Sequence, residues 1–515
     1  MLAMSLLRHR RTLRTAVIGV TTMGLVLGAA GCSQLTDGRA VIGQPQVGAP
    51  VEWEPCVFSG GAQVDLPPGT ECGTLAVPID YDNPDSGVAD LALIRMPATG
   101  EKIGSLVVNP GGPGESGVEA AVSMVTALPA EVRERFDFVG FDPRGVGSST
   151  PAVWCNSDAD NDELRADPTV EYTPEGVAHI NQMTEEFIAR CVDKMGTEFL
   201  ENVGTDNVAR DLDAIREAVG DDKLTYLGYS YGTRIGAAYA EQFPQNVRAM
   251  ILDGAVDPNA DPFEADIKQA TAFQNAFNDF AADCATDPDC PLGTDPTKAV
   301  ERYQSLIEPL IAEPGTTTDP RGLSHSDAIV GTIMTLYSPS LWRHLKQGLT
   351  ELESGRGDTM LILADMYMRR SQDGSYTNAN DVRIAVNCVD KPRENDMAKL
   401  VEQDRLLREA APFMSYGEFT GLTPTPTCGM WPVEPTSEPH EVSVPDLPPT
   451  LVVSSTGDPA TPYEAGAELA KQLGGGMLTF DGTQHTVVFQ GNACVDDYAT
   501  QYLIDGAMPA PGARC

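Results

Sequence analysis

Short apolar runs of strand length recur along the chain, and segments with apolar residues at helical spacing separate several of them. The stretch 207–219, with Val208, Leu212, Ile215 and Val219 on one face, is such a helical segment. Because buried strands that alternate with helices form parallel sheets covered on both faces, the pattern predicts an α/β fold with a mostly parallel sheet. The strand-like runs are residues 91–96, 105–109, 136–141, 224–228, 248–252, 450–454 and 477–480.

The alternation stops near Asp257 and resumes near Pro449, with helical patterning over the roughly 190 residues between them. An insertion between two core strands would lie over the carboxyl ends of the strands. We therefore expect a large helical cap, or lid, that controls access to a site there. Met, Tyr and Trp side chains in 329–345 and 361–368 either line an apolar pocket or form the cap's own core.

At 515 residues, the chain is longer than one hydrophobic core usually supports. We therefore divide it into a core that is interrupted by the cap and preceded by an export segment. The predicted parts are a signal peptide at 1–31, a lipidated N-terminus and tether at 32–52, the first part of the core at 53–257, the helical cap at 258–435 and the second part of the core at 436–515.

The pentapeptide GYSYG at 228–232 lies between a strand-like run and a helical segment. Such a strand-to-helix turn forces strained backbone angles on the central Ser230, and small residues two places either side avoid collisions. The turn lifts the serine hydroxyl clear of the sheet, beside the Tyr231 N–H at the helix N-terminus. We therefore predict Ser230 as a nucleophile and the Tyr231 N–H as one donor to an oxyanion.

A serine hydroxyl needs a base to take its proton and a carboxylate to orient that base. Among the six histidines, His485 follows the last strand-like run, where the base is expected when the chain order is nucleophile, acid, histidine. Asp458 follows the preceding strand and is the leading choice for the acid, with Asp253 as the alternative. Thr461 either orients the Asp458 carboxylate by a hydrogen bond or caps the following helix.

A glycine-rich loop, NPGGPG at 109–114, comes at the end of the strand-like run that begins at Ser105. Glycines let backbone N–H groups approach a substrate oxygen closely. Gly111 and Gly112 are therefore the candidates for the second oxyanion donor, and a plain tight turn is the alternative.

The N-terminus has the pattern of an export signal. Four arginines, at positions 8, 10, 11 and 14, precede an apolar run at 16–31 that is too short to span a bilayer. Cys32 directly follows Ala-Ala-Gly, as in a bacterial lipobox, which predicts export and a lipid anchor on Cys32 at the outer face of the cell membrane. Ordinary secretion with a free N-terminal cysteine is the alternative, and the general and twin-arginine export routes both stay open.

Cysteine number supports this prediction, because eleven cysteines less Cys32 leave ten, enough for five disulfides in an exported chain. The order along the chain suggests that neighbours pair, although the sequence does not fix the connectivity. No pair has the spacing of a zinc or redox site, and we expect no metal and no cofactor. The suggested pairs are Cys56 with Cys72, Cys155 with Cys191, Cys284 with Cys290, Cys388 with Cys428, and Cys494 with Cys515.

The charge balance is strongly acidic, with 74 Asp and Glu against 35 Lys and Arg and a net charge of −39. Nucleic acid and anionic lipid head groups would be repelled, so we expect neither as a docking partner. Membrane attachment would come from the lipid on Cys32.

Four motifs together resemble exported actinobacterial α/β-hydrolases related to tripeptidyl aminopeptidases and proline iminopeptidases. They are NPGGPG at 109–114, GYSYGTR at 228–234, DPATP at 458–462 and GTQHTV at 482–487, and the resemblance covers residues 51–515. It implies an α/β-hydrolase fold with a helical lid over the catalytic residues, attachment to the cell envelope, and hydrolysis of peptide or ester bonds.

One position departs from the family. Proline iminopeptidases usually begin the glycine loop with His, whereas this chain has Asn109. Their recognition of a free amino group on the substrate therefore does not carry over. Such recognition would need a carboxylate near the site, and Glu115, just beyond the glycine loop, is the candidate, with a solvated loop glutamate as the alternative.

Three functions are compatible with the motifs. Acyl-enzyme hydrolysis of peptides leads, a carboxylesterase acting on envelope lipids or other esters would use the same residues, and a non-catalytic envelope-binding lipoprotein is the remote third. The expected partners are a peptide, protein or ester substrate and the membrane. The sequence makes no prediction of oligomeric state.

Overall fold

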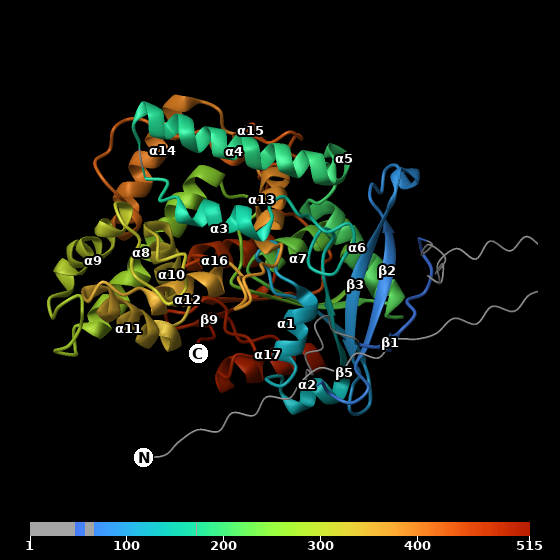
Figure 1. Cartoon of the computed structure of the whole chain (residues 1–515). Coiled ribbons are helices and arrows are strands. Elements are labelled where there is room, and N and C mark those ends of the chain that lie inside the picture. Colours follow the sequence, from blue (N-terminus) through green and yellow to red (C-terminus); the bar gives the residue numbers. More distant parts are fainter. Residues whose placement is uncertain (1–46, 57–65, 171) are drawn as a thin grey trace, which may run out of the picture. The chain divides into compact units, whose positions relative to one another are not determined.

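The computed structural model describes residues 47–56, 66–170 and 172–515. Its sheet has the strand order β1-β2-β3-β5-β4-β6-β7-β8-β9 (Figure 1). Strands β4 to β9 run parallel to one another, and β1, β2 and β3 form an antiparallel edge that joins the sheet through the antiparallel pair of β3 and β5. This confirms the expected mostly parallel sheet. The strands are β1 Glu54–Pro55, β2 Glu71–Pro78, β3 Val88–Met96, β4 Gly104–Asn109, β5 Phe136–Phe141, β6 Leu224–Tyr229, β7 Val247–Asp253, β8 Leu451–Ser455 and β9 Gly476–Phe480.

Helices cover both faces of the sheet because its strands are apolar on both sides. Val107 of β4 packs in one hydrophobic cluster with α6 (Thr205–Ala218), α7 (Tyr231–Gln242) and α16 (Tyr463–Gln472). Its neighbours Leu106 and Val108 pack in another, with α1 (Gly117–Met124), α2 (Ala130–Arg135) and α17 (Ala493–Asp505). The two-residue period of the strands thus divides the core into two layers.

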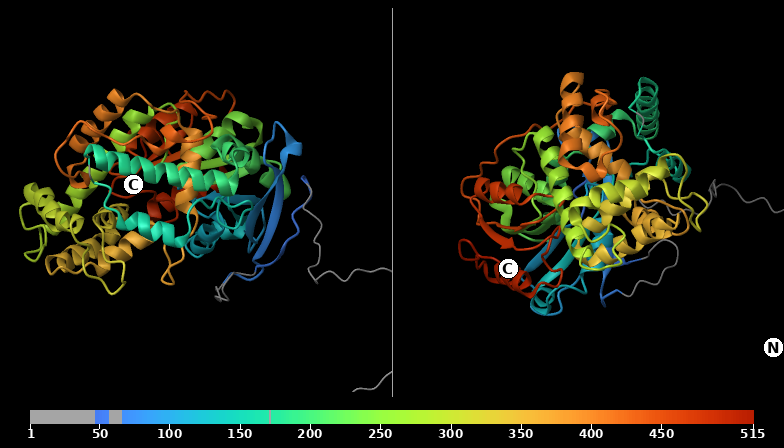
Figure 2. Two further views of the ribbon diagram at one scale, coloured as in Figure 1. Left: turned by 45° about the horizontal axis from the view of Figure 1, so that its top comes forward. Right: turned by 90° about the vertical axis from the view of Figure 1, so that its left-hand side faces the viewer.

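The cap is inserted between β7 and β8 and lies to one side of the sheet (Figures 1 and 2). Its core is aromatic, with the Phe277 and Phe413 rings stacked at 4.8 Å and Tyr303 edge-on to Phe277 at 5.2 Å. The helices of this insertion are α8 Pro262–Cys284, α9 Ala299–Ile307, α10 His325–Leu336, α11 Trp342–Glu353, α12 Asp358–Tyr367, α13 Ala379–Asp390, α14 Met397–Ala410 and α15 Thr427–Met430. Short 3-10 turns occur at Pro84–Ser86, Pro244–Asn246, Pro296–Lys298, Glu308–Ile311, Pro339–Leu341 and Pro412–Met414.

Most of the apolar residues in 329–345 and 361–368 form the core of the cap. Leu336, Leu345 and Leu361 are buried in one cluster with the aromatic side chains. Tyr337 and Tyr367 differ, because they line a cavity that also contains Ser230. The pocket interpretation therefore holds for these two tyrosines.

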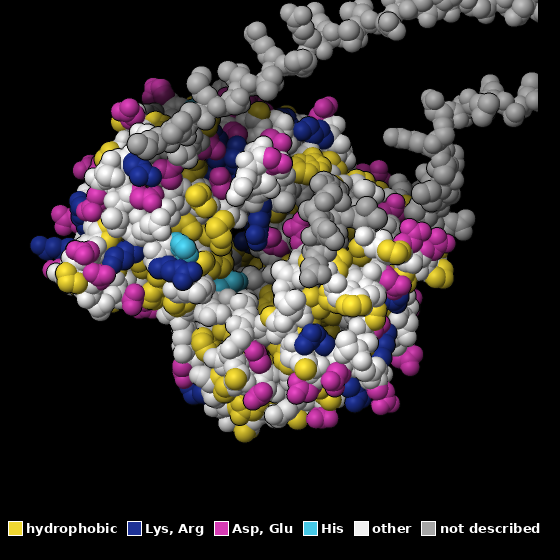
Figure 3. Space-filling view, turned by 60° about the horizontal axis from the view of Figure 1, so that its bottom comes forward, with side chains coloured by type: hydrophobic (Ala, Val, Ile, Leu, Met, Phe, Trp, Pro, Cys, Tyr) yellow, Lys and Arg dark blue, Asp and Glu magenta, His cyan; other side chains and the backbone are white. Residues whose placement is uncertain are grey.

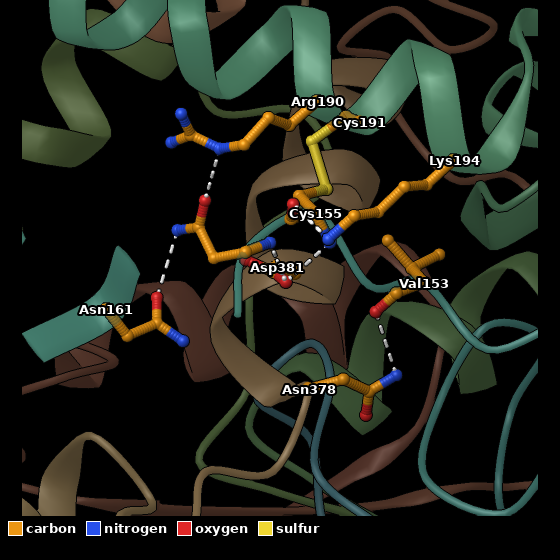
Figure 4. Close-up of a disulfide and its surroundings, with 9 residues drawn as sticks. Val153, Cys155, Asn161, Arg190, Cys191, Lys194, Asn378 and Asp381 are labelled. Atoms are coloured by element: carbon orange, nitrogen blue, oxygen red, sulfur yellow. Dashed lines mark hydrogen bonds between the residues drawn. A yellow bond between two sulfur atoms is a disulfide. The ribbon is translucent and has the colours of Figure 1, made fainter. Parts of the chain in front are cut away.

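A second excursion, between β5 and α6, also packs on the cap, which the sequence analysis did not anticipate. It contains α3 (Asp158–Ala166), α4 (Pro174–Met195) and α5 (Thr197–Glu201). Figure 4 shows how it is attached: the Cys155–Cys191 disulfide holds α4, and the Cys155 N–H donates to the Asp381 carboxylate of α13 at 2.8 Å. Although we assigned these residues to the core, their apolar side chains share a cluster with α13 and Trp431.

Five disulfides are present, and each joins the neighbours that the chain order suggests. The signal peptide, Cys32 and most of the tether lie outside the described residues. In the part of the chain that is described, no helix is both long and apolar enough to cross a membrane.

Candidate active site

Ser230 occupies the sharp turn between β6 and α7. Its φ of +53° is a strained conformation that residues with side chains seldom adopt, as the pentapeptide predicts. The Ser230 N–H donates to the Asp253 carbonyl at the end of β7, at 2.9 Å, which fixes the turn to the sheet. Tyr231 is the first residue of α7, so its N–H lies among the helix donors that have no partner within the helix.

The glycine loop packs directly against this turn. Gly111 has φ +95°, and a Cβ atom there would lie 2.5 Å from the Tyr229 carbonyl oxygen and 3.0 Å from the Tyr231 nitrogen. Only glycine permits this approach. The Gly111 N–H donates to Asn109 Oδ1 at 2.9 Å, whereas Gly112 lines the cavity beside Ser230. Of the two predicted donors, Gly112 is therefore the better placed for a substrate oxygen.

Asp458 and His485 form a buried pair. His485 Nδ1 lies 2.9 Å from each Asp458 carboxylate oxygen, and the two side chains are 9% and 0% exposed. Three donors from the loop after β8 hold the same carboxylate: the Ala460 and Thr461 N–H groups at 2.9 Å and the Thr461 hydroxyl at 3.0 Å. Thr461 therefore orients the carboxylate, which was one of its two expected roles, and Pro462 rather than Thr461 is the residue that precedes α16.

The charge of Asp458 controls the protonation of His485. Burial by itself would lower the pKa of this histidine, but the negative charge and hydrogen bond of Asp458, with a smaller contribution from Asp253, raise it. The imidazolium is thus stabilised where a base must hold a proton temporarily.

Asp253, the alternative acid, does not contact the His485 ring by a hydrogen bond in the described chain. Its Oδ2 instead accepts the Val487 and Val488 N–H groups, each at 2.7 Å. Complete burial raises its pKa to about 7, although both hydrogen bonds and the charge of His485 act in the opposite direction. Asp253 therefore holds the loop that carries His485, a role that its position in the sequence does not reveal.

Ser230 and His485 both lie near the end of β7. A Cβ atom at Gly254, which has φ +66°, would lie only 3.2 Å from His485 Cε1, and the preceding residue accepts the Ser230 N–H. The described residues include no hydrogen bond between the two side chains. In hydrolases without substrate such bonds are often long and tighten when substrate binds.

Tyr337, at the end of α10, connects the cap to His485. Its carbonyl accepts the His485 N–H at 3.0 Å, and its ring stands edge-on to the imidazole with centroids 5.3 Å apart. Sequence reasoning could not single out this contact, because the two residues lie 148 positions apart (485 minus 337) in different parts of the fold.

The structure corrects the role suggested for Glu115. Both oxygens of this carboxylate accept from Arg369, which follows α12 in the cap: Nε lies 2.9 Å and Nη2 2.8 Å away. Glu115 is also absent from the residues that line the cavity beside Ser230. It joins the glycine loop to the cap and is not positioned to bind a substrate amino group.

A cavity of about 560 Å³ opens onto Ser230 between the core and the cap. The core contributes Gly112, Ser230 and Tyr231, and the cap contributes Tyr337 and Tyr367. Near the centre of the face in Figure 3, apolar, basic and histidine side chains gather together. The described residues contain no group of three or more His, Cys, Asp or Glu side chains arranged to hold a metal ion.

Among the known proteins that match nearly the whole chain, three relatives illustrate its similarities. The chain is 63% identical to the serine protease Hip1 of Mycobacterium tuberculosis H37Rv over the full length of both. It is 48% identical to carboxylesterase B of the same organism, over 99% of this chain and all of the relative. It is also 32% identical to the tripeptidyl aminopeptidase of Streptomyces coelicolor, over 93% of this chain and 88% of the relative.

These relatives confirm the actinobacterial resemblance that the four motifs indicate. The family model for the alpha/beta hydrolase fold also matches residues 104–492, a range that contains Ser230, Asp458 and His485. The fold, the strained serine turn and the match agree, and the chain belongs to the α/β-hydrolase family.

Proposed function

We propose that this chain is a serine hydrolase that cleaves peptide bonds through an acyl-enzyme. Ser230 is the nucleophile, His485 the general base and acid, and Asp458 the group that orients His485. The observation that carries the proposal is the buried Asp458–His485 pair beside the end of β7, where the Ser230 turn is anchored. A histidine held in this way by a carboxylate is the arrangement that activates a serine hydroxyl.

The chemistry proceeds in two halves. Ser230 Oγ attacks the carbonyl carbon of the substrate while its proton passes to His485. The resulting oxyanion accepts hydrogen bonds from the N–H groups of Tyr231 and Gly112. His485 then gives the proton to the leaving amine, and the C–N bond breaks. Water, losing its proton to His485, attacks the acyl-enzyme, and proton return to Ser230 releases the carboxylic acid.

Two observations support a peptide as the substrate. Among the relatives, one is named a serine protease and another a tripeptidyl aminopeptidase. The cavity beside Ser230 shares Lys268, Pro462 and Glu464 with a second cavity of about 530 Å³ that Asp458 also lines. Two adjoining cavities suit an extended chain. The alternative is ester hydrolysis, which the name of carboxylesterase B favours.

A matched substrate series tests the proposal. Purified protein would be offered one peptide sequence with a free amino terminus, the same sequence N-blocked, and the corresponding ester, with Ser230→Ala as the control. We expect cleavage of at least one peptide form and no turnover by the variant. Turnover of the ester alone would establish the esterase, and failure of a fluorophosphonate to label Ser230 in folded protein would favour a non-catalytic lipoprotein.

We also propose that the chain is exported and anchored by a lipid on Cys32 to the outer face of the cell membrane. Support comes from the arginine-rich apolar N-terminus and from the cysteine count, since the other ten cysteines pair in disulfides. Metabolic labelling with a fatty-acid probe should mark the wild-type protein and not Cys32→Ala, which should move to the soluble fraction. Equal labelling of both proteins would contradict the anchor.

A further inference from the structure

One face of helix α13 forms a wall of the catalytic cleft. Arg383, Asn387, Asp390 and Lys391 all line the cavity that contains Ser230. Arg383, Asn387 and Asp390 follow one another at intervals of four and three residues, which places them along one side of the helix, and Lys391 directly follows its last residue. Whatever binds beside Ser230 therefore passes along a polar helical wall.

This wall is fixed at both ends. Before the helix begins, the Asn378 side chain donates to the carbonyls of Gly145 and Val153 at 2.8 and 3.0 Å, and the contact with Val153 is visible in Figure 4. At the other end, Asp390 accepts the Thr205 N–H of α6 at 2.8 Å. The disulfide from Cys388 adds a covalent link to α15. A side chain on α13 is therefore presented to the cleft from a rigid support.

Arg383 differs from the other cations of the cleft. Arg234 lies 3.7 Å from the Asp390 carboxylate, Lys391 3.9 Å from that of Asp266, and Lys268 3.9 Å from that of Glu264. Arg383 is half-buried, yet the described residues provide it with no ion pair and no hydrogen bond. Among the four cations that line this cavity, the described residues leave only Arg383 without a carboxylate within 4 Å.

Arg383 also lies close to the proposed catalytic residues. Its charge acts on the Tyr337 phenol, where burial raises the pKa of the tyrosine and Arg383 opposes the rise. Tyr337 in turn packs edge-on against His485. Arg383 and Tyr337 therefore line the same cavity, and Tyr337 connects that cavity to His485.

We propose that Arg383 binds a carboxylate of the substrate and so selects negatively charged substrates. A guanidinium offers a planar pair of donors that matches a carboxylate, and a partly buried one gains most from such a partner. The carboxylate is either the C-terminus of a short peptide or an Asp or Glu side chain. This inference rests on the proposed hydrolase function and adds the class of substrate to it.

Esters test the site independently of peptide cleavage. Mono-4-nitrophenyl adipate and suberate carry a carboxylate at two distances from the reacting carbonyl, and 4-nitrophenyl hexanoate and octanoate are their neutral partners. We expect Arg383→Gln to raise KM for the better charged ester by roughly tenfold to a hundredfold, the usual value of a hydrogen bond to a charged group. KM for the neutral esters should change by about twofold or less, because no charge is lost there.

Three further variants make the result specific. Arg343→Gln removes an exposed arginine of α11 outside the cleft and should leave both ester classes unchanged. Arg383→Lys should keep part of the preference for the charged esters, and Arg383→Glu should abolish it. If Arg383→Gln slowed charged and neutral esters equally, or neither, in protein with an unaltered circular dichroism spectrum, the inference would be overturned. If Arg383→Gln failed to fold, Arg383→Lys and Arg383→Glu would decide in its place.

Peptides then identify the source of the carboxylate. One sequence would be compared with a free C-terminus, a C-terminal amide, and Glu or Gln inside the chain. Loss of preference for the free C-terminus in Arg383→Gln identifies the terminal carboxylate, and loss of the Glu preference identifies the side chain. If the charged esters respond to Arg383→Gln while no peptide is cleaved, the proposed peptidase function fails and the carboxylate site stands.

Discussion

Two buried aspartates lie at the ends of neighbouring parallel strands, and they differ in what they hold. Asp253 is the last residue of β7, and Asp458 follows β8 by three positions. Both aspartates are buried, and the negative charge of each raises the pKa of His485. Asp458 contacts the imidazole itself, whereas Asp253 binds the backbone two and three residues beyond it.

Hydrogen-bond donors explain the difference better than burial does. The Asp458 carboxylate accepts from Ala460 and Thr461 as well as from the histidine, so its charge is well supported. At Asp253, both N–H donors meet Oδ2, and Oδ1 has no partner among the described residues. A buried carboxylate with one unpaired oxygen keeps its proton to higher pH, and the pKa of Asp253, raised to about 7, leaves it about half protonated at pH 7. Both aspartates are thus buried, and the hydrogen-bond donors around each carboxylate determine which of the two orients His485.

The largest expected effect comes from Asp458→Asn. An amide at this position can hold His485 in the wrong tautomer, so kcat should fall by about 10⁴-fold, as in other serine hydrolases with this change. The pKa of His485 should also fall, because burial then acts without the charge of Asp458. The acid limb of the kcat/KM profile should move to lower pH. Ester turnover between pH 5 and 9 measures both effects, with Ser230→Ala as the baseline.

A kcat above about one tenth of the wild-type value in Asp458→Asn would show that another acid supports His485, since loss of the orienting carboxylate otherwise costs far more. Asp253 would then be the candidate. The double variant Asp253→Asn/Asp458→Asn would decide, because it should be no slower than Asp458→Asn if Asp253 has no catalytic role.

Asp253→Asn should act mainly on stability. The pKa of Asp253 is raised to about 7 in the folded chain but lies near 3.9 when unfolded, so between these values the folded state binds the extra proton. Wild-type stability should therefore decline as pH rises from 4 to 7, by at most about 4 kcal/mol from this group. The variant should lack this decline. Denaturant unfolding at pH 5 and pH 8 measures the difference.

The activity of Asp253→Asn is the second measurement. The asparagine oxygen can still accept the Val487 and Val488 N–H groups, so kcat at the pH optimum should stay within about tenfold of wild type. Two results would contradict the role of Asp253 as a support for the loop that carries His485. One is an equal decline in stability with pH in wild type and Asp253→Asn, and the other is a loss of activity comparable to that of Asp458→Asn.

Thr461→Val should have an intermediate effect. It removes one hydroxyl donor from Asp458 while the Thr461 N–H remains, and loss of one hydrogen bond to a charged group should lower kcat by roughly tenfold. Thr461→Ser keeps the hydroxyl and is the matched control. If both variants kept wild-type kcat, the two backbone donors would suffice to orient the carboxylate.

The strands and the serine turn could be predicted from sequence because their determinants are local. A buried strand needs only an apolar run, and Ser230 needs only its flanking glycines and the adjoining strand and helix. The 3-residue interval between Asp458 and Thr461 is also local, which is why the hydrogen bond from the threonine to the carboxylate could be anticipated.

Long-range contacts could not be predicted in the same way. Whether Asp253 or Asp458 faces the imidazole depends on the path of two loops, and the sequence could only rank them. The packing of α4 and α5 on the cap depends on surfaces contributed by α13 and Trp431. The Cys155 N–H, for example, donates to Asp381, which lies 226 positions away (381 minus 155). Glu115 was misassigned for the same reason, because its partner Arg369 lies in another part of the chain.

The smallest effect is expected from Glu115→Gln, because Glu115 is a third carboxylate that is only half-buried. Glu115 and Arg369 are 30% and 47% exposed, and ion pairs screened by water contribute about 0.2–1 kcal/mol. Stability should fall by no more than that, and kcat should change by about threefold or less because the glycine loop is also held by Asn109. Arg369→Gln should change stability and kcat by similar amounts, and the double variant Glu115→Gln/Arg369→Gln should lose no more stability or kcat than either single variant. A large loss of kcat in Glu115→Gln that Arg369→Gln did not reproduce would instead mean that Glu115 itself meets the substrate.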